Sequence, residues 1–155
     1  MSNQPTANSR NVVRAAAATR ILLGFVFFVF GLNGFLQFLP VPPIEGQAGA
    51  FLGALAATGY MFPLIKGTEV LAGALLLSNR FVPLAITLLA PVIVNIVAFH
   101  LVLAPGSYGL LAFIVAAPIF LAWVHRDVFR SLLRPHHKLV VGEANASPHS
   151  RPVAV

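Results

Sequence analysis

Residues Ile21–Leu39 read ILLGFVFFVFGLNGFLQFL, nineteen residues without a charged side chain, bounded by Arg20 and Pro40. A helix needs about 20 apolar residues, each rising about 1.5 Å, to cross the ~30 Å hydrocarbon core of a bilayer. The stretch therefore predicts a transmembrane helix. The run PVPP at 40–43 ends it, because proline cannot donate a backbone hydrogen bond and clashes with the preceding turn.

The whole chain has the composition of an integral membrane protein. Of its 155 residues, 58% are hydrophobic and only 9% are charged, whereas a soluble domain carries roughly 25% charged residues. The mean hydropathy is +0.87. Three more apolar segments resemble spans: Phe62–Ser78, Phe81–Ala104 and Tyr108–Val124. We therefore expect an all-α fold, a four-helix transmembrane bundle that forms one domain over residues 20–125.

The segments outside the four predicted spans are polar, basic or short. Residues 1–19 are expected to be a cytoplasmic tail, disordered up to residue 9, and residues 139–155 a disordered C-terminal tail. The segment 126–138 predicts a basic amphipathic helix on the membrane surface. Its three arginines recur at every fourth position on one helical face: Arg126, Arg130 and Arg134.

The segment Gln47–Met61 is apolar and rich in glycine and alanine, but it is too short for a span. Three arrangements are compatible with it. It is an interfacial helix, a re-entrant helix, or an extension of the second span that tilts away at Pro63.

The arginines define an orientation. With four spans, the arginines near the spans all fall on one side of the membrane: Arg10, Arg14, Arg20, Arg80, Arg126, Arg130 and Arg134. The other side holds Glu45. The positive-inside rule then places both termini in the cytoplasm. The formal net charge of +6 therefore predicts contact with the anionic head groups of the lipid bilayer, and not with nucleic acid.

The chain contains no cysteine. Disulfides, thiolate metal sites and a thiol relay carried by this chain alone are therefore excluded. His100 and His125 fall near opposite faces of the membrane on neighbouring spans, so they cannot ligate one haem iron together. No metal site is predicted.

The strongly polar residues of three spans fall in one layer. Asn33 lies about 20 Å from the cytoplasmic face, Asn95 about 21 Å, and Glu69 about 10 Å from the outer face, which is nearly the same depth in a ~30 Å core. Lys66 and Gln37 are one turn shallower, and His100 ends the third span. This coincidence predicts a polar cluster in the outer half of the bundle.

Lys66 and Glu69 are three residues apart and can pair on one helix face. A charge at mid-bilayer costs about 2.5–3.5 kcal/mol, so Glu69 is expected to face the bundle interior. There Asn33, Asn95 or His100 could donate to it, or Glu69 is protonated. Simpler roles stay open: the asparagines join helices, Lys66 extends to the interface as an anchor, and His100 is a surface residue.

Three blocks of sequence resemble one family: RILLGFVFFVFGLNGF, then ATGYMFPLIKGTEVLAGALLLSNRFVPLA, then PVIVNIVAFH. In this order over four short spans, from Arg20 to about Trp123, the chain resembles the DoxX-like membrane proteins. The resemblance implies a four-helix protein of the bacterial inner membrane. Some relatives are linked to thiosulfate:quinone oxidoreductase, and others to a membrane complex for thiol or oxidant defence.

Three functions are compatible with these observations. The first is an accessory or membrane subunit of an oxidoreductase system, in which six residues bind a quinone or carry its protons: Glu69, Lys66, Asn33, Asn95, His100 and Gln37. Any thiol chemistry would then belong to a partner redox protein. The second is a non-catalytic structural subunit of a membrane complex. The third is a small proton-coupled carrier, although no inverted repeat of the kind found in transporters is present.

Overall fold

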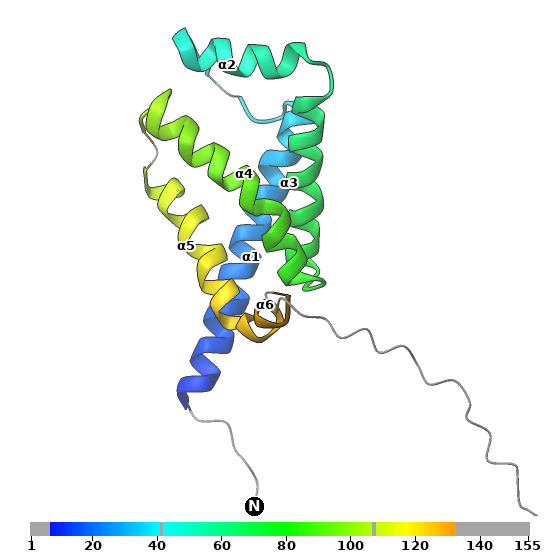
Figure 1. Cartoon of the computed structure of the whole chain (residues 1–155), viewed down its shortest axis with the longest axis vertical. Coiled ribbons are helices and arrows are strands. Elements are labelled where there is room, and N and C mark those ends of the chain that lie inside the picture. Colours follow the sequence, from blue (N-terminus) through cyan, green and yellow to red (C-terminus); the bar gives the residue numbers. More distant parts are fainter. Residues whose placement is uncertain (1–6, 41, 107, 133–155) are drawn as a thin grey trace, which may run out of the picture.

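The computed structural model describes residues 7–40, 42–106 and 108–132, and every regular element in these ranges is a helix (Figure 1). The helices are α1 (Ala7–Leu36), α2 (Gly46–Ala57), α3 (Met61–Leu77), α4 (Val82–Val102), α5 (Tyr108–Val124) and α6 (Arg126–Leu132).

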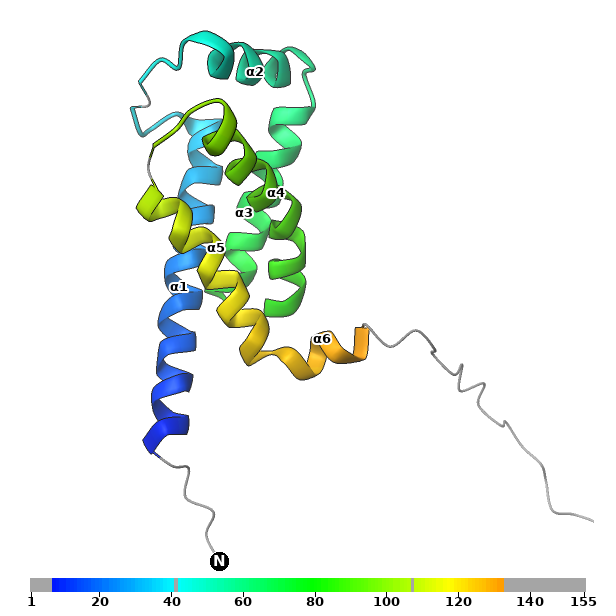
Figure 2. The ribbon, with the colours of Figure 1, turned by 60° about the vertical axis from the view of Figure 1, so that its left-hand side comes forward.

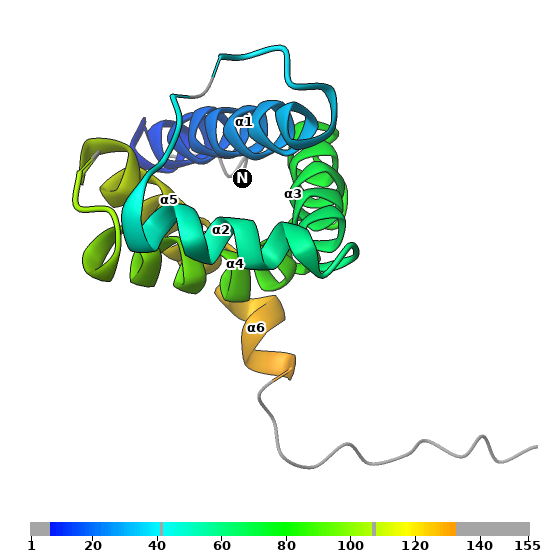
Figure 3. The same cartoon turned by 90° about the horizontal axis from the view of Figure 1, so that it is seen from above.

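Four of the helices form a closed ring. α1 packs against α3 and α5, and α4 packs against the same two helices from the other side (Figure 3). The largest fully buried side chains come one from each of these helices: Leu23, Leu76, Leu89 and Leu121. The hydrophobic core is therefore the centre of this ring, and it connects all four helices.

The contact between α1 and α3 is the closest in the ring because glycines line it. A Cβ atom added to Gly73 would lie 2.6 Å from the backbone nitrogen of Phe28 and 2.9 Å from the carbonyl oxygen of Gly24. A Cβ atom on Gly31 would lie 2.9 Å from the backbone nitrogen of Val70. Small residues at such positions let two helix backbones approach closely, as in membrane helix pairs.

α2 does not continue α3. The two helices meet at an angle of 91°, and α2 lies across one end of the ring (Figures 1 and 3). The bend is made by Thr58 and by Gly59, whose φ of +73° suits glycine. The Thr58 hydroxyl donates to the carbonyl of Leu55 (2.7 Å) and accepts from the amide of Met61 (3.0 Å). The bend lies at Thr58 and Gly59 and not at Pro63, which is inside α3. With an angle of 91°, the two helices are a broken span or a re-entrant segment.

The outer surface of the ring is apolar. Ser9–Leu36 and Val82–Val102 are long and apolar enough to cross a membrane, although only 22% and 28% of their apolar windows are buried. The bent pair α2 and α3 adds a third such segment if it counts as one span, and α5 is apolar but shorter. Large apolar side chains that face outward include Phe25, Leu71, Leu84 and Ile119. Such a surface suits a membrane protein.

The helix bounds agree closely with the four predicted segments except at the first helix. α5 coincides with the predicted Tyr108–Val124. α1 begins at Ala7, well before Ile21, because the run AAAA at 15–18 has the highest helix propensity, and its N-terminal part projects beyond the other helices (Figure 2). It ends at Leu36 because Gln37 adopts a left-handed φ of +50°. Residues 7–9 were expected to be disordered, but they belong to α1. Residues 1–6 and the tail 139–155 lie outside the described residues.

The basic segments gather at the end of the ring opposite α2. The N-terminal part of α1, the turn between α3 and α4, and α6 all lie there (Figures 1 and 2). In α6, Arg126 stands over the Trp123 ring at 5.3 Å and Arg130 pairs with Asp127 at 3.7 Å. Both arginines are exposed. Arg134 lies outside the described residues, as does the rest of the predicted helix from 133 to 138.

Arg20 ties α1 to the end of α3. Its guanidinium donates to the carbonyls of Leu76 and Leu77, the last residues of α3. The Leu76 carbonyl also accepts from the backbone amide of Asn79 at 3.1 Å, and a cation at this end of the helix complements the helix dipole. The flanking arginine thus acts as a helix cap between two neighbouring helices.

Replacing Arg20 with methionine is expected to lower the free energy of unfolding by about 1–2 kcal/mol, because a charge-assisted cap is lost while the apolar stem stays. Unfolding by SDS titration in mixed micelles, followed by circular dichroism, measures the change. The control is Arg14→Met at an exposed position of the same helix. An equal effect of both substitutions would contradict the capping role.

Candidate ligand-binding site

A cavity of about 560 Å³ lies between α2, α3 and α4. Ligand pockets typically enclose about 300–1,000 Å³ and are mostly apolar with a few polar groups. The wall of this cavity is apolar except for six side chains: Lys66, Thr68, Glu69, Thr87, Asn95 and His100. Leu64, which is 60% exposed, forms part of its rim. The cavity therefore opens on the outward-facing surface of the helix ring, beneath α2.

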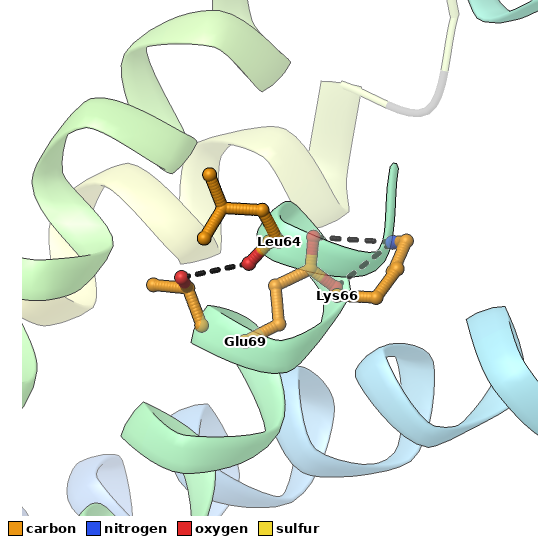
Figure 4. A network of polar contacts seen from close by, with 4 residues as sticks. Leu64, Lys66 and Glu69 are labelled. Atoms are coloured by element: carbon orange, nitrogen blue, oxygen red, sulfur yellow. Dashed lines mark hydrogen bonds and ion pairs between the residues drawn. The ribbon is translucent and has the colours of Figure 1, made fainter. Parts of the chain in front are cut away.

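α3 contributes an ion pair to this wall. The Lys66 ammonium donates to both carboxylate oxygens of Glu69, at 2.8 and 3.1 Å (Figure 4). The Glu69 side chain is 4% exposed and the Lys66 side chain 21%. The Lys66 ammonium also lies 5.8 Å from the centre of the Phe62 ring, a cation–π distance. Pairing compensates the charges where water is scarce.

α4 contributes a stripe of residues to the opposite wall. Thr87, Pro91, Asn95 and Phe99 recur at every fourth position, so they lie on one face of the helix, and all four line the cavity. Pro91 has no amide hydrogen, so it leaves the carbonyl of Thr87 without its usual helical donor. The Asn95 amide donates to the carbonyl of Pro91 at 2.9 Å and keeps its own carbonyl oxygen and one N–H for other partners.

His100 marks the end of the cavity beside α2. Its Nδ1 lies 2.8 Å from the carbonyl oxygen of Ile96. A carbonyl only accepts, so Nδ1 carries a proton and the Nε2 of the neutral ring is free to accept one. Phe99 packs on Phe51 of α2 at a ring distance of 5.9 Å, and on the His100 ring at 5.4 Å. The contact between Phe51 and Phe99 joins α2 to α4 over the cavity.

The structure brings together four of the six predicted site residues. Glu69, Lys66, Asn95 and His100 line the cavity, whereas Asn33 and Gln37 do not. The Asn33 side chain accepts from the amide of Leu39 at 2.6 Å and donates to its carbonyl at 3.5 Å, so it closes the end of α1. Gln37 is exposed, and its backbone N–H donates to the backbone carbonyl of Asn33 at 2.9 Å.

The expectation that Asn33, Asn95 or His100 donates to Glu69 is wrong. Lys66 supplies both hydrogen bonds that Glu69 accepts, while the other three side chains bond to backbone carbonyls. For Asn95 and His100 this carbonyl lies four residues earlier, within reach on the same helix, whereas Asn33 bonds to Leu39 beyond the end of α1. Equal depth in the membrane was therefore not enough to join these groups.

Sequence reasoning missed two kinds of site residue. Thr87 belongs to the stripe at every fourth position of α4, which was readable from the sequence. Gly34 lies behind the ion pair on α1, and a Cβ atom there would be 2.5 Å from Cγ of Lys66. The spacing of three from Gly31 to Gly34, on the helix that faces α3, is the signal that could have indicated it.

The acidic and histidine residues do not form a metal centre within the described ranges, where no three of them lie close enough to hold an ion. Comparison with known proteins finds no family model, no curated protein and no solved structure that matches this chain.

Proposed function

We propose that this chain is a DoxX-like protein of the bacterial inner membrane that serves as a membrane subunit of an oxidoreductase system and binds a quinone between α2, α3 and α4. The cavity carries the proposal: it is apolar, open at the outer face of the helices, and has the Lys66–Glu69 pair set into its wall. A lipid-soluble ligand with a polar head group suits that combination.

Two observations favour a four-helix transmembrane arrangement with both termini in the cytoplasm. α3 and α5 complete the ring with the two longer helices α1 and α4, and about 17 residues is the lower limit for a span. The described arginines gather at one end of the ring, and Glu45 lies before α2 at the other. The positive-inside rule makes the arginine end cytoplasmic. The cavity then lies in the outer half of the membrane.

The polar groups of the cavity fit a quinone head group. A quinone has two carbonyl oxygens that accept hydrogen bonds on opposite edges of a flat ring. Lys66 uses two donors on Glu69 and has a third, and Asn95 has one N–H left on the other wall. The apolar side chains Leu88, Val92 and Phe99 offer a surface for the ring and the hydrocarbon tail.

The acid–base groups of the chain fit the proton side of quinone chemistry. A bound quinone supplies the redox step, since it takes up two electrons and two protons to become a quinol. Glu69 and the Nε2 of His100 are placed in the wall to hold protons during that change. Any thiol chemistry that supplies the electrons belongs to a partner redox protein, because this chain has no cysteine.

Glu69→Gln is expected to weaken quinone binding about 10- to 100-fold, the equivalent of one charge-assisted contact of about 1.5–3 kcal/mol. The loss arises because a neutral amide no longer holds the Lys66 ammonium in place. Titration of the protein in nanodiscs with decylubiquinone measures the affinity, and assembly with the partner and quinone-dependent activity are scored in parallel.

Glu45→Gln is the matched control, since Glu45 is exposed and does not line the cavity. The proposal expects normal assembly and lost quinone-dependent activity for the Glu69 variant, and normal values of both for the control. Wild-type affinity and activity after Glu69→Gln would contradict it. A change in thermal stability alone would instead favour a structural subunit, and proton flux into liposomes above the lipid background would favour a carrier.

A further inference from the structure

The lysine of the buried ion pair lies on a glycine of the neighbouring helix. The three atoms nearest to a Cβ built on Gly34 all belong to Lys66: Cγ at 2.5 Å, Cδ at 2.6 Å and Cβ at 3.2 Å. The backbone of α1 at Gly34 is thus the surface against which the lysine stem rests. Any side chain at this position would occupy the space of that stem.

The position of the stem decides where the ammonium lies. In an isolated helix, a lysine three residues before a glutamate is the weaker order for an ion pair. The bidentate contact of 2.8 and 3.1 Å therefore depends on a constraint from outside α3, and the wall at Gly34 supplies one. Lys66 is 21% exposed and has room to turn outward, whereas Glu69 is 4% exposed and does not.

We infer that Gly34 is a positioning residue of the cavity: by having no side chain it holds the Lys66 ammonium on Glu69 at the ligand wall. Gly31, one turn earlier, acts differently. A Cβ there would meet the backbone nitrogen of Val70 at 2.9 Å and Cβ of Glu69 at 3.0 Å, so it sets the spacing of the two helices. The positioning of Lys66 by Gly34 does not depend on the proposed quinone function; only its expected consequence for ligand affinity does.

The direct test is the reactivity of the lysine amine in the Gly34→Ala variant. The chain has two lysines, Lys66 and Lys138, so acylation at Lys66 can be expressed as a ratio to Lys138 by mass spectrometry. We expect a severalfold rise in this ratio, since the displaced amine leaves the carboxylate. The matched control is Gly24→Ala on the same helix, where the added Cβ meets Leu76 and Gly73 and not Lys66.

An unchanged ratio in the Gly34 variant, or an equal rise in the Gly24 variant, would overturn the inference. A second measurement tests the inference even if the Gly34→Ala variant fails to fold. The added methyl group clashes with Cγ and Cδ of Lys66, so Gly34→Ala should lower the melting temperature in the wild-type background and not in a background that carries Lys66→Ala and Glu69→Leu, where no carboxylate is left unpaired. Loss of folding in both backgrounds would overturn the inference, and recovery in the second supports it.

Ligand binding separates this inference from the proposed function. Decylubiquinone affinity of Gly34→Ala should fall together with the rise in Lys66 acylation. A raised acylation ratio with wild-type quinone affinity would uphold the positioning role of Gly34 and overturn quinone binding at this wall. An unchanged acylation ratio with weakened quinone affinity would overturn the positioning role of Gly34 and leave quinone binding at this wall supported.

Discussion

Replacing Lys66 with methionine is expected to lower the free energy of unfolding by about 3–5 kcal/mol, the cost of leaving a buried charge without its partner. Glu69 is only 4% exposed, and both hydrogen bonds that it accepts come from Lys66. Methionine keeps most of the volume of the lysine stem beside Gly34, so the effect reports the lost charge and not a lost contact. SDS titration in mixed micelles, followed by circular dichroism, measures it.

The double replacement of Lys66 by methionine and Glu69 by leucine should recover most of this loss. Exchanging a buried ion pair for apolar residues of similar size is often neutral or stabilising by about 1–4 kcal/mol. The exposed pair of Arg130 and Asp127, 3.7 Å apart, is the control: Arg130→Met should change stability by less than about 1 kcal/mol. A double variant as unstable as Lys66→Met would contradict this account.

The double variant also distinguishes a functional pair from a structural one. If the pair serves only to hold helices together, apolar replacement leaves a stable protein with every activity of the complex intact. If the pair serves ligand binding, the same stable protein no longer binds decylubiquinone. An ionisable pair set into an apolar helix, where apolar residues could give equal stability, is itself a reason to expect a function for it.

The helices were predictable from the sequence because apolar runs and proline or asparagine turns bound each one. α5 has the predicted bounds, and α3 and α4 differ from them by one or two residues at each end. The direction of α2 was not predictable. It follows from the conformation of Thr58 and Gly59, where a short polar turn makes an angle of 91°, and an apolar pattern does not encode an angle.

The candidate site was predictable in part. Depth along each helix brought Glu69 and Asn95 to one level, with Lys66 one turn shallower, and all three line the cavity. Depth carries no information about the direction of a side chain around its helix, so Asn33 was wrongly grouped with them. It folds back on Leu39 at the end of α1 instead. The role of Gly34 depends on the packing of two helices, which one sequence does not give.

Replacing Gly73 with alanine is expected to lower the free energy of unfolding by about 1–3 kcal/mol, the usual cost of overpacking. The added Cβ would lie 2.6 Å from the nitrogen and 2.8 Å from the Cα atom of Phe28. Both atoms belong to the backbone of α1, so no side chain can turn away and the helices have to separate. The separation would also loosen the ion pair one turn away at Glu69, and decylubiquinone affinity should fall with stability.

The control for this prediction lies on the same helix. Gly67 has nothing within 4 Å of its added Cβ, so alanine there should stabilise the helix by up to about 1 kcal/mol, because glycine is the poorer helix former. Glycine to alanine on α3 is thus expected to lower the free energy of unfolding at Gly73 and to raise it at Gly67. The difference arises because only Gly73 contacts α1. Equal effects at Gly67 and Gly73 in the SDS titration would show that α1 and α3 do not pack through their glycines.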